Sequence, residues 1–133
     1  MTSRERVSAA LNFKEADRVP IDFGGLDCTS IHIDEYCELL RELGSDGVPK
    51  VVDQFDMVAG MDDVTVERFH CDTVMLDRPK MTFNLRNENF KPWTTFQGNK
   101  VLMPGNFHPR EDENGDLWID DADGNALAHM PNG

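Results

Sequence analysis

Hydrophobic positions recur with the clearest helical period between residues 36 and 44. Four large side chains here fall at positions i, i+3, i+4 and i+7, namely Tyr36, Leu39, Leu40 and Leu43. This spacing places them on one face of an α-helix. Gly44 follows them, where a glycine commonly ends a helix, and Ser30 or Asp34 is the expected N-cap. The pattern therefore predicts an amphipathic helix that stops at Gly44.

Two shorter stretches also carry helical signals. Thr2 and Glu5 match the S/T-x-x-E capping box, and a modest apolar stripe follows them, so we expect a surface helix over residues 3–12. In residues 62–69 the positions of Val64 and Phe69 indicate a helix that turns both side chains inward.

Short apolar runs lie between these helices. Residues 19–23 alternate apolar and polar side chains, residues 72–76 form a second run, and residues 50–53 are a third, shorter candidate. Strands that alternate with helices are typical of a parallel sheet covered by helices. Residues 1–79 are therefore predicted to be an α/β unit.

The character of the chain changes at residue 80. Residues 80–133 show no helical period, and two hairpin signals, Asn114-Gly115 and Asp123-Gly124, flank the apolar run 117–119. We expect residues 126–130 to pair with that run. From residue 106 onward, seven acidic residues stand against one arginine, which is half of the net charge of the chain. This region is predicted to be acidic and rich in β-hairpins.

Composition narrows the class of protein. The chain has 133 residues, enough for one domain, and its 25 Asp and Glu against 13 Lys and Arg give a net charge of −12. Nucleic acids and anionic membranes attract clustered Lys and Arg, so we expect neither as a partner. Signal-peptide and membrane-spanning patterns are missing, and the three cysteines are an odd number without close pairing. We therefore predict a reduced, cytoplasmic protein.

Several segments resemble, in order, the N-terminal part of the uroporphyrinogen decarboxylase superfamily. The run from Thr2 to Asp22 contains TSRERV and DRVPID, and Gly24-Gly25 and TSIH follow it. ERF and DTV within residues 67–74 look like the next helix-to-strand junction of that family. DENGDLW at residues 112–118 is similar to a D-E-x-G-x-x-W hairpin of its decarboxylase-like and methyltransferase-like members. The resemblance covers nearly the whole chain.

This resemblance implies the N-terminal portion of a (β/α)₈ TIM barrel with an inserted β-hairpin region. A complete barrel takes about 250 residues. Residues 1–79 would supply the first helix and the first βα units, and residues 80–133 would be the insertion. On this interpretation the chain is a fragment that is inactive alone, and the remainder of its own barrel is a partner.

The resemblance also implies two activities. True uroporphyrinogen decarboxylases hold a substrate with eight carboxylates through arginines in the loop after the first strand, because a guanidinium pairs a carboxylate bidentately. Here that loop, residues 24–32, has no arginine and carries Asp27. Methyl transfer involving a corrinoid protein is therefore favoured. Decarboxylation in porphyrin biosynthesis is the runner-up, and a non-catalytic acidic interaction module is the third interpretation.

Barrel enzymes collect their active sites at the C-terminal ends of the strands. The residues expected there to bind a small-molecule substrate are Asp22, Gly24, Gly25, Thr29, His32, Asp77 and Arg78. Each has a structural alternative: a tight turn for the glycines, a helix cap for His32, a charged turn for Asp77 and Arg78, and bonds to loop amides for Asp22. No residue is assigned a catalytic role.

The chain is predicted to hold no metal of its own. Cys28, His32 and Cys37 are spaced C-x₃-H-x₄-C, but the set lacks a fourth ligand, and Cys37 fits a buried apolar position. Zinc and a protein-bound corrinoid are expected only for a full-length protein, on His and Cys residues that the resemblance places after Gly133.

Overall fold

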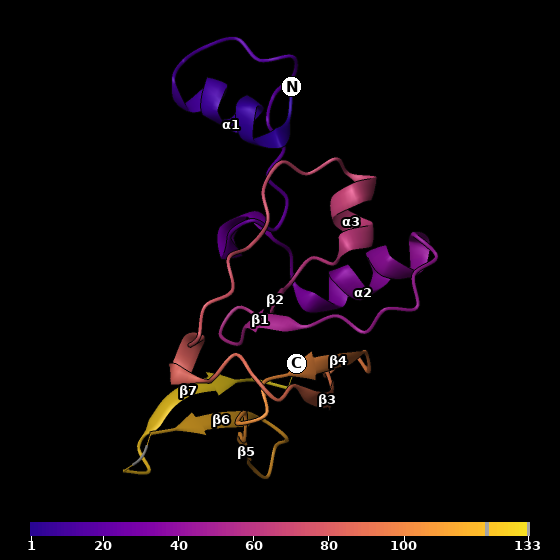
Figure 1. Ribbon diagram of the computed structural model, residues 1–133. Coiled ribbons are helices and arrows are strands. Elements are labelled where there is room, and N and C mark those ends of the chain that lie inside the picture. Colours follow the sequence, from indigo (N-terminus) through magenta and orange to yellow (C-terminus); the bar gives the residue numbers. More distant parts are fainter. Residues whose placement is uncertain (122, 133) are drawn as a thin grey trace.

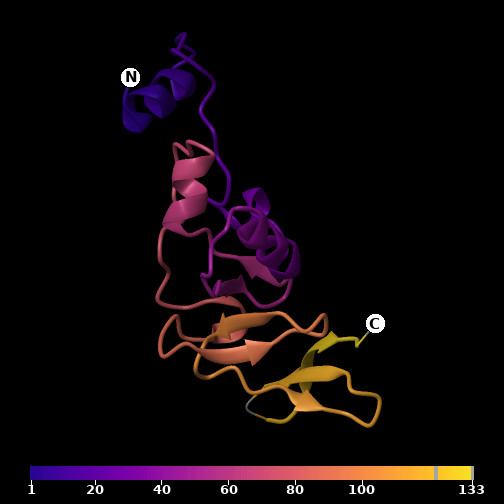
Figure 2. The same cartoon turned by 90° about the vertical axis from the view of Figure 1, so that its right-hand side faces the viewer.

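The elements are arranged in three tiers in the computed structural model, which describes residues 1–121 and 123–132 (Figures 1 and 2). The helices are Ser3–Leu11 (α1), Ile33–Glu42 (α2) and Asp63–Arg68 (α3), with 3₁₀ turns at Asp27–Thr29 (η1) and Thr82–Asn84 (η2). The strands are Val51–Asp53 (β1), Val58–Ala59 (β2), Lys91–Thr94 (β3), Lys100–Met103 (β4), Arg110–Glu111 (β5), Leu117–Asp120 (β6) and Ala126–Met130 (β7). In Figure 1, α1 lies at the top, α2 and α3 lie with β1 and β2 in the middle, and the other strands lie below. The described residues thus form a mixed α/β structure.

The helix α2 packs its apolar face against the interior, as predicted. Tyr36 is fully buried, and Gly44 ends the helix with φ +69°. The predicted N-cap was wrong: His32 is the cap, and its ring accepts a hydrogen bond from the backbone N–H of Asp34. The chain is extended just before the helix because Ile31 and Ile33 pair with the β2 segment through backbone hydrogen bonds. The helix therefore begins only after residue 32.

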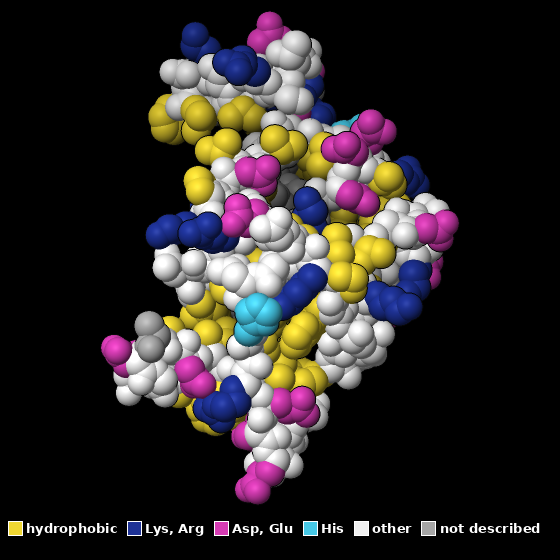
Figure 3. Space-filling model, turned by 60° about the horizontal axis from the view of Figure 1, so that its bottom comes forward, with side chains coloured by type: hydrophobic (Ala, Val, Ile, Leu, Met, Phe, Trp, Pro, Cys, Tyr) yellow, Lys and Arg dark blue, Asp and Glu magenta, His cyan; other side chains and the backbone are white. Residues whose placement is uncertain are grey.

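The helices α1 and α3 form where they were predicted, α1 as a surface helix and α3 with more exposure than expected. The capping box is confirmed, because Thr2 accepts a bond from the N–H of Glu5 and the carboxylate of Glu5 accepts one from the N–H of Thr2. Leu11 is 76% exposed. The inward orientation predicted for Val64 and Phe69 was wrong, since they are 46% and 38% exposed. In Figure 3, hydrophobic side chains lie open to solvent just beneath the uppermost part of the molecule.

The predicted parallel sheet is absent from the described residues, in which each sheet is antiparallel. The sheets are β1–β2, β3–β4 and β5–β6–β7. The strand predicted at residues 50–53 is confirmed as β1, but a short turn returns the chain into β2, so the pair is a hairpin. The two C-terminal hairpins are also confirmed. Gly115 and Gly124 take positive φ in their turns, and Leu117 pairs with Met130 across β6 and β7.

The strands predicted at residues 19–23 and 72–76 were wrong, because both segments are extended without forming a ladder. They lie side by side and run in the same direction (Figure 1). The N–H of Asp72 donates to the carbonyl of Ile21 at 2.7 Å, and farther along, Thr73 bonds to Asp22. Apolar side chains such as that of Leu76, 84% exposed, have no cover here. A single backbone bond between two exposed segments does not sustain a strand pair.

The core lies between α2, the β1–β2 hairpin and the β3–β4 hairpin. Its least exposed apolar residues are Ile33, Tyr36, Leu40, Val51, Ala59, Val101, Met103 and Phe107. The N–H of Leu102 donates to the carbonyl of Pro49 and ties the middle tier to the lower one. In the described part of the chain, no helix has the length and apolar character needed to cross a membrane.

A network of ion pairs joins α1 to the two extended segments. The carboxylate of Asp72 is fully buried and accepts hydrogen bonds from Arg6 at 2.5 Å, from Arg18 at 2.6 Å and from the N–H of Ile21 at 2.9 Å. Arg6 also pairs with Asp17 at 2.7 Å, and Asp17 binds the N-terminal ammonium group. Because α1 has little apolar contact with the middle tier, these charges hold it in place.

We expect this network to make the protein acid-sensitive. Burial raises the pKa of Asp72, but the bonds from Ile21, Arg18 and Arg6 outweigh burial and hold it well below the usual 3.8. Arg6 and the N-terminus lower the pKa of Asp17 in the same way. Both carboxylates therefore stabilise the fold above about pH 4, and this contribution is lost as the pH falls through their lowered values. Thermal melts from pH 7 to pH 2 should show a falling Tm below about pH 4, and a flat profile there would contradict this.

Candidate functional site

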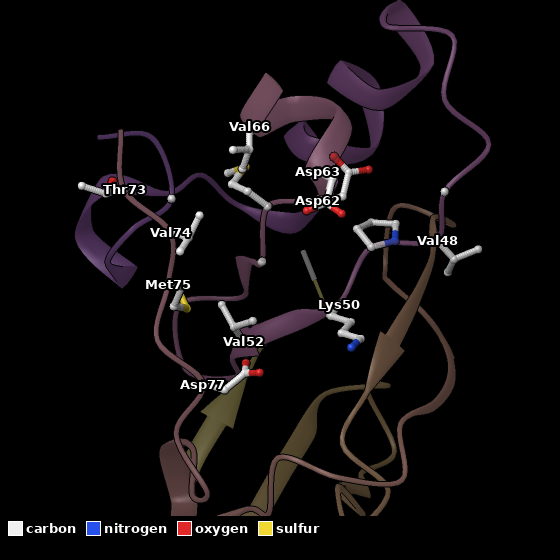
Figure 4. A pocket seen from close by; sticks show the side chains of 15 residues that line it. Val48, Lys50, Val52, Asp62, Asp63, Val66, Thr73, Val74, Met75 and Asp77 are labelled. Atoms are coloured by element: carbon white, nitrogen blue, oxygen red, sulfur yellow. The ribbon is translucent and has the colours of Figure 1, made fainter. Parts of the chain in front are cut away.

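The loops that follow the two extended segments form the candidate site. Residues 73–77 divide it into two hollows, which we call the first hollow and the second hollow. The first hollow, about 520 Å³, is lined by Asp22, Gly25, Leu26, Asp27, Thr73, Val74, Met75, Leu76 and Arg78. The second hollow, about 430 Å³, lies between residues 73–77 and the start of β1, below the N-terminus of α3 (Figure 4). The structure thus brings Asp22, Gly25 and Arg78 to the lining of one hollow.

Asp22 is held by a local set of hydrogen bonds. Its Oδ1 accepts the N–H of Gly25 at 2.9 Å and the hydroxyl of Thr73 at 2.6 Å. Gly25 is required here, because a Cβ at this position would overlap both Oδ1 of Asp22 and the side chain of Thr73. Among the described residues no donor bonds to the second oxygen of Asp22, and the residue as a whole is exposed.

Arg78 is engaged by an acidic neighbour. Its guanidinium donates to both oxygens of Asp27, at 2.9 and 3.1 Å. Asp27 is thus the partner of the one arginine that lines the first hollow. A guanidinium paired in this way has its planar fork already occupied by a carboxylate.

Gly24 and Asp77 line the second hollow rather than the first. Gly24 adopts φ +83° and lies against Met61, so any side chain there would overlap Met61. The charged groups around this hollow are mainly acidic: Asp62, Asp63 and Asp77, with Lys50 the single base in its lining (Figure 4). Both hollows are therefore suited to neutral or cationic groups rather than to anions.

Thr29 and His32 do not reach these hollows. The hydroxyl of Thr29 accepts a hydrogen bond from the N–H of Leu26 at 3.0 Å, and the backbone carbonyl of Thr29 accepts one from the N–H of Gly24. Thr29 therefore stabilises the conformation of the loop. His32 caps α2 and lines a separate hollow with Asp34 and Trp93.

Two residues that matter for the site were not among the predicted ones. Thr73 fixes Asp22, and Asp27 occupies Arg78. Thr73 could have been found from the sequence, because parallel pairing of residues 19–23 with residues 72–76 places Thr73 beside Asp22. The sequence does not indicate the partner of Arg78, because an ion pair between two loops depends on how both loops fold.

Metal ligands do not gather in the described part of the chain, where no three His, Cys, Asp or Glu side chains are placed to hold an ion. Cys28 is exposed, Cys37 lies on the buried face of α2, and Cys71 is partly buried beside Phe23. Burial raises the pKa of the Cys37 thiol, which disfavours the thiolate that zinc requires. These residues do not fit a zinc site.

Comparison of the chain with family models, with curated proteins and with solved structures finds no match.

Proposed function

We propose that this chain is the first part of a (β/α)₈ barrel of the uroporphyrinogen decarboxylase superfamily, in a protein that transfers a methyl group with the help of a corrinoid protein. Two features support the barrel. The segments 19–23 and 72–76 run in the same direction, and the residues between them include α2 and α3, as in a βα unit with an elaborated connection. The β-hairpins of residues 80–133 correspond to the proposed insertion.

The observation that carries the choice of reaction is the pairing of Arg78 with Asp27. Uroporphyrinogen carries eight carboxylates, and an enzyme that binds it needs cations free to receive them. Here the arginine of the first hollow is already neutralised, and the second hollow is lined by three carboxylates against one lysine. Such a site repels a polyanion and accepts a small neutral or cationic substrate.

Asp22 is the residue of this chain that we assign to the substrate. Gly25 and Thr73 hold its Oδ1, which leaves the other oxygen to accept a hydrogen bond from a hydroxyl or ammonium group of the substrate. The described residues do not supply ligands for a metal or a corrin, so we derive no step through either group. The role of this chain in the proposal is to bind and orient the substrate.

Substitution of Asp22 tests this assignment. In the full-length protein, with methylcobalamin as the methyl donor, Asp22→Asn should lower kcat/KM about tenfold, the value of one charge-assisted hydrogen bond. The loss should fall on KM, because Asp22 binds the substrate and does not react. Glu113→Gln, which changes an exposed carboxylate in the β5–β6 turn, is the matched control and should leave the rate unchanged.

The same preparation distinguishes the alternatives. No methyl transfer, together with conversion of uroporphyrinogen to coproporphyrinogen, would replace the proposal with decarboxylation. Absence of both reactions would leave the non-catalytic acidic interaction module as the remaining interpretation. An unchanged KM in Asp22→Asn would remove Asp22 from the substrate site even if methyl transfer is observed.

A further inference from the structure

The hollow beside His32, which we call the third hollow, lies where the N-terminus of α2 meets the β3–β4 and β6–β7 hairpins. It shares no lining residue with the two hollows of the candidate site. Its volume of about 590 Å³ is within the range of pockets that bind small molecules. The lining side chains that determine its chemistry are His32, Asp34, Met57, Trp93, Phe96 and Glu111. The third hollow therefore joins acidic and aromatic groups in a space large enough for a ligand.

Asp34 gives this hollow a carboxylate that is almost completely buried. Its side chain is 6% exposed, and its Oδ1 accepts hydrogen bonds from the Thr95 hydroxyl at 2.5 Å and from Nδ2 of Asn99 at 2.7 Å. The amide of Asn99 is oriented in turn by Arg41, which donates to the amide oxygen. Two neutral donors from the β3–β4 turn thus fix the orientation of the carboxylate, and neither of them neutralises its charge.

The other carboxylate oxygen of Asp34, Oδ2, accepts no hydrogen bond from the described residues. It is not closed to solvent, because Oε1 of Gln54 is the one polar side-chain atom among those residues that is both closed to water and unbonded. One basic group of the described chain lies within 4 Å of Asp34, namely Nδ1 of His32, and its distance of 3.7 Å from Oδ2 is too long for a hydrogen bond. A nearly buried carboxylate without a cation is costly. Since Asp34 lines the third hollow, Oδ2 is an acceptor that opens into it.

The surroundings of Oδ2 favour an organic cation. The described lining of the third hollow holds no lysine or arginine, and Glu111 adds a second, exposed carboxylate to it. Trp93 and Phe96 contribute aromatic rings, which attract cations through their electron-rich faces. The described residues do not bring together three side chains that could hold a metal ion. One open carboxylate oxygen beside aromatic walls is instead the arrangement that suits an ammonium group with an apolar body.

We propose that the third hollow binds the ammonium group of a small organic amine. The ammonium group donates a hydrogen bond to Oδ2 of Asp34, and the apolar body of the amine lies against Trp93 and Phe96. The inference is independent of the proposed methyl transfer, because none of these residues belongs to the candidate site.

The test compares 2-phenylethylamine with 2-phenylethanol, which has nearly the same shape and no charge. In titrations of the 133-residue protein, the amine should bind about tenfold more tightly, the difference between a charge-assisted and a neutral hydrogen bond. NMR locates the site, because the indole N–H signal of Trp93 should shift. The signal of Trp118, the other tryptophan of the chain, should not shift, because Trp118 lies outside the lining. Equal affinities, or binding that does not shift the Trp93 signal selectively, would overturn the proposal.

The variant Asp34→Asn isolates the carboxylate. The asparagine oxygen still accepts the bonds from Thr95 and Asn99, whereas its NH₂ group takes the place of Oδ2, so the amine and the alcohol should then bind about equally. Glu42→Gln removes an exposed carboxylate from the far end of α2 and is the control, which should keep the tenfold preference. A preference that survives Asp34→Asn would show that the net charge of the chain attracts the amine, and would refute the role of Asp34. Should Asp34→Asn fail to fold, the affinities and the Trp93 signal of the unaltered protein decide.

Discussion

Replacing Asp72 with asparagine is expected to lower the free energy of unfolding by about 3 kcal/mol, the typical cost of removing one member of a buried ion pair. The Asp72 carboxylate is fully buried between two guanidinium groups. Asparagine keeps the shape of the side chain and still accepts a hydrogen bond from the N–H of Ile21. Arg6, whose side chain is only 8% exposed, loses one of the two carboxylates that pair with it. Urea unfolding followed by circular dichroism measures the change.

The control for this variant lies in the same segment. Asp77→Asn removes an exposed carboxylate five residues farther along and should change the free energy of unfolding by less than about 0.5 kcal/mol. If the two variants are equally stable, charge at Asp72 does not hold the N-terminal part in place. The Asp72→Asn protein should also show a smaller decline in Tm below about pH 4, because one of the two carboxylates of the network is gone.

Removing the hydroxyl of Tyr36 is expected to cost about 2 kcal/mol of unfolding free energy. Tyr36 of α2 is fully buried, and its hydroxyl donates to Oδ1 of Asp62 at 2.8 Å and accepts the N–H of Asp62 at 2.9 Å. Thr65 lies 2.8 Å from the same oxygen. Asp62 caps the N-terminus of α3, so this one hydroxyl joins the two helices. Tyr36→Phe removes the acceptor of the N–H of Asp62 and leaves Oδ1 of Asp62 with the N–H of Thr65 alone.

Thr94→Val provides the comparison for Tyr36→Phe. It deletes an exposed hydroxyl in β3 and should leave the free energy of unfolding within about 0.5 kcal/mol of its original value. Tyr36 can also be observed directly, since it is the single tyrosine of the chain. Burial raises its pKa to about 12, so the tyrosinate absorption band should appear near that pH. Ionisation near pH 10 would show that the hydroxyl is not buried.

Local structure was predictable because each signal lies within a few residues. The period of α2, the capping box at Thr2 and the glycines of the two C-terminal turns all formed as expected. Each depends on backbone geometry or on a neighbour three or four positions away. The same applies to the pairing of β6 with β7, which a tight turn dictates.

Longer-range features were harder to predict. Residues 19–23 and 72–76 have the composition of strands, yet their apolar side chains lie largely uncovered, and the one backbone hydrogen bond between them does not make a ladder. The two predicted segments nevertheless lie together, and that contact places Asp22 beside Thr73. The pairing of Asp27 with Arg78 could not be foreseen, because any of several acidic residues could have reached that arginine.

The ion-pair network also bears on the order in which the protein folds. Arg6 and Asp72 are 66 positions apart, and Arg18 and Asp72 are 54 apart. The β5–β6–β7 meander, by contrast, joins residues close in sequence, and such hairpins form within microseconds. Closing the longer loop costs more chain entropy and slows the step that needs it. We therefore expect the N-terminal helix to join the fold after the β5–β6–β7 meander has formed.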